Sequence, residues 1–136
     1  MTLIMAIASG PCCSRWQKLS LCPGTDLQFF IDFVQEILDG IGPGTPQRRR
    51  CFLMDNLITN RHPIIAQMII AAGHCIVYHA PYYPVDGPIE YVFNTIQQEL
   101  AYGMHFIKDL PTLHGHVNAI LASLEEFQSY FVHCGY

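Results

Sequence analysis

A short apolar segment that ends in an acid, CFLMD at residues 51–55, decides the predicted fold. Its four apolar residues do not alternate with polar ones, which is typical of a strand buried on both faces. A second segment of this kind, CIVY, occupies residues 75–78, and residues 61–72 between them predict a helix that stops at Gly73. A strand, a helix and a strand in this order predict two parallel strands. Asp55 would then follow the carboxyl end of the first strand, which is where such sheets bind ligands.

The remaining segments extend this pattern on both sides. Two strands are predicted at residues 3–8 and 16–21, and the Gly-Pro turn region between them suits a hairpin. A long helix is expected to begin at Pro88, which fits the first helical position, and to be broken by Pro111. Residues 112–131 then predict a last helix.

The first helix is predicted over residues 25–38. Thr25 and Gln28 have the spacing of a capping box, and Gly40 is expected to end the helix. Strands that alternate with helices predict an α/β fold, with a mixed sheet flanked by helices. The length of 136 residues corresponds to one domain, so residues 1–136 are expected to form one unit of this fold.

Composition excludes several classes of protein. With 51% hydrophobic and 13% charged residues, the chain as a whole is not disordered. The net charge of −4 argues against a strongly basic, autonomous nucleic-acid binder, since Arg48, Arg49 and Arg50 are the one basic run. The longest apolar stretch, residues 64–73, is too short to span a membrane, so no membrane partner is expected.

The six cysteines do not predict a metal site. They lie at positions 12, 13, 22, 51, 75 and 134, and none forms a C-x-x-C pair. We interpret them as small buried hydrophobic residues in a reducing compartment. A small Cys/His metal-binding domain is disfavoured by the same spacing.

Two local motifs resemble those of one enzyme family. MDN at residues 54–56 is similar to the strand-end D-N of the mariner-type transposases, a group of DDE endonucleases. HAPYYPVDGPIE at residues 79–90 resembles their loop-to-helix motif P-P-Y-S-P-D-L-N-P-I-E, with Pro88, Ile89 and Glu90 matching as a block. Thirty-four residues separate Asp55 from Glu90, as in one large branch of that family. The joint occurrence of the motifs and their spacing carries the resemblance.

The resemblance implies a fold, an activity and a cofactor. The fold would be ribonuclease-H-like, and the activity would be metal-dependent DNA cleavage and strand transfer, as in DNA transposition and integration. Three carboxylates would hold two divalent cations, Mg²⁺ or Mn²⁺. Asp55 would be the second carboxylate and Glu90 the third, while Asn56 would support Asp55 or bind the substrate backbone.

The chain also departs from the family pattern. The family's first aspartate ends a strand that precedes the one at residues 3–8, and here only Met1 and Thr2 come before it. We therefore expect an N-terminally truncated domain that lacks the first central strand and is inactive alone, so that its status as an enzyme stays open. Strand edges left open by that gap would make the chain marginally stable or prone to aggregate. The alternative is a non-catalytic, domesticated remnant that acts as a nucleic-acid-binding or protein-binding module.

Candidate contacts to DNA follow from the same resemblance. Arg48, Arg49 and Arg50 could contact phosphates, although a solvated loop end before a strand is the favoured interpretation. Tyr82 and Tyr83 could stack on bases, although such side chains more often pack their own loop. The implied partners are DNA and either an intact transposase copy or a second copy of this chain. A DNA substrate in turn implies a nuclear location.

Overall fold

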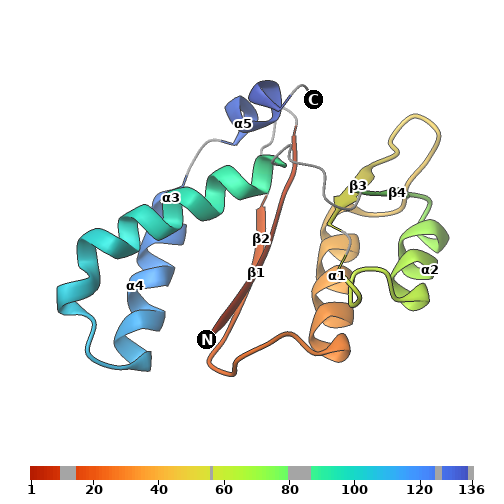
Figure 1. Ribbon diagram of the computed structural model, residues 1–136. Helices are drawn as coiled ribbons and strands as arrows, with labels where there is room; N and C mark the ends of the chain where they lie inside the picture. The colour runs from red at the N-terminus through yellow and green to blue at the C-terminus, as the bar shows by residue number, and fades with distance from the viewer. Residues whose placement is uncertain (10–14, 56, 80–86, 125–126, 135–136) are drawn as a thin grey trace. The chain divides into compact units, whose positions relative to one another are not determined.

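The computed structural model describes residues 1–9, 15–55, 57–79, 87–124 and 127–134 (Figure 1). It divides into two compact units. Unit 1 combines Met1–Gly24 with Val85–Tyr136, and unit 2 is the continuous stretch Thr25–Pro84. Both contain helices and strands, so the predicted α/β class is confirmed.

Unit 1 begins with an antiparallel hairpin. Strand β1 (Thr2–Ile7) pairs with β2 (Arg15–Ser20) in a register that places Thr2 opposite Ser20 and Ile7 opposite Arg15. The two strands predicted at residues 3–8 and 16–21 are thus confirmed to within one residue. The turn expected at residues 10–11 lies outside the described residues.

Four helical segments complete unit 1: α3 (Pro88–Gly103), the 3₁₀ turn η1 (Met104–Phe106), α4 (Leu110–Ser123) and α5 (Gln128–His133). Helix α3 packs against α4 and against β1 (Figure 1). The buried residues between these elements are Val92, Ile96, Val117, Ile120, Leu121 and Phe127. Burial of these apolar side chains supplies the main favourable free energy of unit 1.

The helix boundaries of unit 1 correct two predictions. The long helix does begin at Pro88, but it ends at Gly103 rather than at Pro111. Pro111 lies in the first turn of α4, because Asp109 accepts a hydrogen bond from the Thr112 amide at 2.8 Å and so starts a new helix.

The last predicted helix, residues 112–131, is divided into α4 and α5. The break comes at Leu124, whose backbone is extended. Its carbonyl oxygen accepts a hydrogen bond from the Arg15 guanidinium at 2.8 Å, which replaces the bond that a continuous helix would make.

Unit 2 is a strand–helix–strand arrangement with one further helix. It contains α1 (Leu27–Ile41), β3 (Cys51–Met54), α2 (Pro63–Ala71) and β4 (Cys75–Tyr78). Strands β3 and β4 are parallel, with Cys51 paired to Cys75 and Met54 paired to Tyr78 (Figure 1). The parallel pair predicted from the two apolar segments is therefore confirmed.

Burial of this sheet differs from the prediction. Phe52, Met54 and Ile76 pack against a core that α1 and α2 supply, with Val34, Leu38, Ile65 and Ile69 at its centre. Leu53 is 36% exposed and Val77 is 50% exposed. The expectation that both faces are buried is wrong, because in unit 2 the helices cover only one face of the sheet.

The start and end of α1 also differ from the prediction. Asp26, and not Thr25, caps the helix by accepting a hydrogen bond from the Phe29 amide at 2.7 Å. Gln28 bonds Asp32 at 2.8 Å instead of completing a capping box. The helix continues through Gly40 and ends at Ile41, and it is capped by Gly42, whose φ of 75° requires glycine.

The described strands form two separate two-stranded sheets. Each strand has one strand neighbour, so each has one edge without a strand partner among the described residues. Open edges of this kind can pair with another chain.

A buried histidine holds unit 2 together. His74 is 1% exposed. Its Nδ1 accepts a hydrogen bond from the Arg50 amide at 3.1 Å, so its Nε2 carries the proton and donates to the Gly42 carbonyl at 2.9 Å. The imidazole thereby links the end of α1, the residue before β3 and the residue before β4.

Replacing His74 with alanine should destabilise the protein. The change leaves the Arg50 amide and the Gly42 carbonyl without their partner and opens a cavity, so the free energy of unfolding should fall by roughly 2–4 kcal/mol. Urea denaturation followed by far-UV circular dichroism measures this loss. His105→Ala is the control, because that imidazole is exposed. Equal stability of the two variants would contradict the role assigned to His74.

Asp109 should make stability depend on pH. Hydrogen bonds from the Thr112 side chain and then from its backbone amide lower the pKa of this carboxyl. Its contribution is therefore fully present above the unfolded pKa, about 3.9, and is lost as the pH falls through the lower folded pKa. Asp109→Asn keeps a capping group that does not titrate. Stability measured from pH 6 downward should then fall less steeply in the variant, and identical slopes would contradict this assignment.

Candidate functional site

The predicted site residue Asp55 lies directly after β3, at the carboxyl end of the parallel pair, and its side chain is exposed. The Asn60 side-chain amide donates a hydrogen bond to Asp55 Oδ1 and lies 3.4 Å from the Asp55 carbonyl oxygen. The first contact orients the carboxylate, and the second holds the same amide group against the Asp55 backbone. The other oxygen, Oδ2, accepts no hydrogen bond from any residue that the structure describes.

The neighbouring strand supports this arrangement from the same edge. The Tyr78 hydroxyl donates to the Asn60 carbonyl at 3.1 Å, so β4 holds the turn that carries Asn60. The His79 amide donates to the Met54 carbonyl at 2.8 Å, which extends the parallel pairing by one residue. Asp55 and His79 are therefore neighbours at the carboxyl edge of the sheet, as the parallel register requires.

Glu90, the second predicted carboxylate, belongs to unit 1. It lies in the first turn of α3 with its side chain exposed, and its amide donates to the Gly87 carbonyl at 3.0 Å. A negative side chain in this position interacts favourably with the positive end of the helix dipole.

Asp55 belongs to unit 2 and Glu90 belongs to unit 1. Their joint binding of metal ions stays a prediction. Asn56, Tyr82 and Tyr83 lie outside the described residues. Within the described ranges there is no group of three or more His, Cys, Asp or Glu side chains that could hold a metal ion.

Three other acids, all on or beside α1, have local structural roles. Asp26 caps the helix, while Asp32 and Asp39 accept hydrogen bonds from glutamines one turn earlier, each at 2.8 Å. Such pairs stabilise the exposed face of a helix. These contacts explain the three acids without a catalytic role.

The arginine run lies at the other end of β3. Arg48, Arg49 and Arg50 are exposed and precede the strand, whereas Asp55 follows it. Five residues of extended chain from Arg50 to Asp55 span about 16 Å. Contacts between these arginines and phosphates would therefore occur one strand length away from the Asp55 carboxylate.

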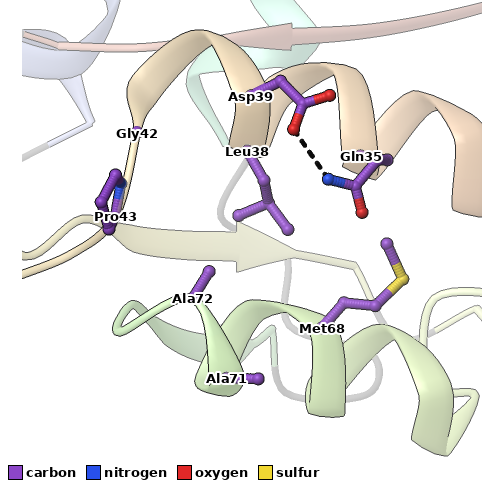
Figure 2. Close-up of a pocket in the computed structure, with 8 residues that line it drawn as sticks. All are labelled: Gln35, Leu38, Asp39, Gly42, Pro43, Met68, Ala71 and Ala72. Carbon is purple, nitrogen blue, oxygen red and sulfur yellow. Dashed lines mark hydrogen bonds between the residues drawn. The ribbon is translucent and has the colours of Figure 1, made fainter.

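A surface depression in the described part of unit 2 is lined by none of the predicted site residues. Its volume is about 570 Å³, and it lies between the C-terminal halves of α1 and α2 (Figure 2). Its polar rim is the hydrogen-bonded pair Gln35 and Asp39, and the remaining lining side chains shown are Leu38, Pro43, Met68, Ala71 and Ala72. A shallow hollow with a single, already paired carboxylate offers little to bind a charged substrate.

No protein-family model matches the chain, and no significant match to a curated protein was found. In the described part of the chain, no helix is both long and apolar enough to cross a membrane.

Sequence reasoning missed two residues that position this site. Asn60 belongs to none of the elements or motifs that the sequence predicts, yet it is the residue that orients Asp55. Tyr78 was read only as part of an apolar strand. The five-residue spacing from Asp55 to Asn60 is the one signal that could have revealed their contact.

Proposed function

We propose that this chain is part of a DDE-type endonuclease domain, with a ribonuclease-H-like arrangement, for DNA cleavage and strand transfer. The observation that best supports the proposal is the Asp55 carboxylate, exposed at the carboxyl end of a parallel strand and oriented by Asn60. This position is where open α/β sheets bind ligands. The order of an antiparallel hairpin, a helix and a parallel strand pair is compatible with the proposed fold.

The chemistry of the donors suits a hard cation. Mg²⁺ and Mn²⁺ prefer carboxylate oxygens, and Asp55 Oδ2 accepts no hydrogen bond from the described residues. A bound pair of such cations would activate the attacking oxygen and stabilise the leaving oxygen of a phosphodiester. The chain's own contribution is to present Asp55 in one orientation, held by Asn60, and to supply Glu90 from the first turn of α3.

Asp55 and Glu90 supply two carboxylates, and the proposed two-metal mechanism uses three. The family scheme requires three, and among the described acids Asp26, Asp32 and Asp39 are engaged on α1. We therefore expect the chain alone to bind the cation and DNA without cleaving the DNA.

A second candidate function is a non-catalytic module that binds nucleic acid. The observation that favours it is the exposed run Arg48 to Arg50, which lies a strand length from Asp55. Binding of this kind would depend on phosphate contacts, and so on salt, but not on the carboxylates. In either case the DNA partner implies a nuclear location, and the open strand edges leave room for an intact transposase copy or a second copy of this chain.

The proposal is tested by Mn²⁺ binding to the chain mixed with a DNA duplex, measured by electron paramagnetic resonance. Asp55→Asn and Glu90→Gln keep the shape of the side chains but remove the charge. Each should weaken Mn²⁺ binding by about tenfold or more, since even outer-shell changes cost that much. Asp39→Asn is the matched control, because Asp39 is an exposed carboxylate that also accepts a hydrogen bond from one amide side chain.

Two results would count against the metal centre. If Asp55→Asn bound Mn²⁺ as tightly as the unchanged chain, Asp55 would not be a ligand. If DNA binding were unaffected by Mn²⁺ and by both variants but fell with added salt, the non-catalytic module would be favoured instead.

A further inference from the structure

Two cysteines lie side by side on the sheet face of unit 2 that the helices leave uncovered. Cys51 and Cys75 are direct partners in the parallel register of β3 and β4, so their side chains point to the same face. Phe52 and Ile76, the next pair, point to the opposite face and into the core. Cys51 is exposed and Cys75 is half-buried, and both are free thiols.

The backbone before β3 adjoins this pair. The Cys75 thiol donates to the Arg50 carbonyl at 3.5 Å, which ties it to the residue that precedes Cys51. Partial burial, followed by the neighbouring Cys75 side chain, raises the pKa of Cys51, while Arg49 acts in the opposite direction. The strand register therefore places the two sulfurs on one face, on directly paired residues.

We propose that Cys51 and Cys75 form a two-sulfur binding site for a soft monovalent cation, of which Cu(I) is the natural example. Thiolate sulfur is the ligand type that selects Cu(I) in proteins. Binding would proceed as Cu⁺ plus two thiols giving a bis-thiolate complex of charge −1 and two released protons. This proposal is independent of the proposed DNA-processing function.

The number of ligands decides against zinc. Structural zinc takes four ligands, and the described residues offer no third metal-binding side chain beside this pair. His74 adjoins Cys75 in the sequence, but its two ring nitrogens are engaged by the Arg50 amide and the Gly42 carbonyl. A site of two sulfurs alone suits an ion that accepts linear two-fold coordination, as Cu(I) does.

The geometry also favours an ion over a disulfide. Neighbouring strands lie about 4.8 Å apart, and in-register side chains on parallel strands keep that separation. A disulfide needs its Cβ atoms within about 3.5–4.5 Å, which would draw the strands together. Two copper–sulfur bonds in line hold the sulfurs two bond lengths apart, so a bound ion does not require the strands to be drawn together.

Charge favours the bound state as well. The bis-thiolate complex is anionic, and the exposed Arg49 lies only two residues before Cys51. The cation at Arg49 would be drawn to the complex once the two protons have left. This gives the arginine run before β3 a role that does not involve nucleic acid.

The test is a titration of the reduced full chain with Cu(I), without oxygen, in competition with a coloured Cu(I) chelator. Cys12, Cys13, Cys22 and Cys134 are first replaced by serine, so that only the proposed pair remains. The four-serine variant should retain one copper ion per chain. Adding Cys51→Ser or Cys75→Ser to that variant should reduce the retained copper to background. Restoring Cys22 is the matched control, because a third exposed cysteine remote in sequence should not increase the copper retained by the pair.

X-ray absorption at the copper edge identifies the atoms bound to copper. It therefore tests the proposal even if the variants that add Cys51→Ser or Cys75→Ser fail to fold. The four-serine chain should show two sulfur neighbours around copper and no nitrogen. A three-coordinate or nitrogen-containing spectrum, or full copper retention after loss of either Cys51 or Cys75, would overturn the proposal.

Discussion

The parallel pairing of β3 with β4 is the constraint on which the described sites depend. Parallel strands need a crossover between them, and α2 provides it while burying Ile65 and Ile69 against α1. The pairing places Asp55 and His79 at the carboxyl edge and Cys51 beside Cys75 at the amino end. One register therefore determines both an oxygen-donor position and a sulfur-donor pair.

His74 makes that register specific. Four paired residues give few interstrand hydrogen bonds, and each contributes only about 1 kcal/mol. The imidazole adds two bonds that link the chain before β3 and the end of α1 to the residue before β4. Gly44 and Gly73 approach closely at the same place, and a Cβ at either would overlap the backbone of the other. Because these contacts are buried and directional, a shifted register would lose them all.

The sequence predicted the strands and the position of Asp55, since unbroken apolar runs and strand–helix alternation are local patterns. It did not predict that β3 has an exposed face, because Cys51 and Leu53 are as apolar as residues that face a core. Pro111 was misassigned because proline both ends one helix and begins the next, and only the Asp109 cap distinguishes the two cases. Asp26 and Thr25 are adjacent capping residues, and backbone geometry rather than residue type decided between them.

The side-chain contacts between distant segments could not be predicted from local sequence patterns, for a different reason. The contact of Asn60 with Asp55 depends on the turn between β3 and α2, and the contacts of His74 join segments far apart in the chain. Neither follows a helical or strand period. The shared role of Asp55 and Glu90 comes from a family resemblance, and it concerns residues of two different units.

That shared role is the central claim, and paramagnetic broadening by Mn²⁺ tests it most directly. The isotope-labelled chain would be mixed with a DNA duplex, and Mn²⁺ would be added well below one equivalent while amide signals are recorded. The account predicts that the signals of Asp55 and Glu90 broaden together, at the same Mn²⁺ concentration, before those of Asp39. Broadening of only one of the two, or of neither, would contradict a metal centre that both carboxylates share.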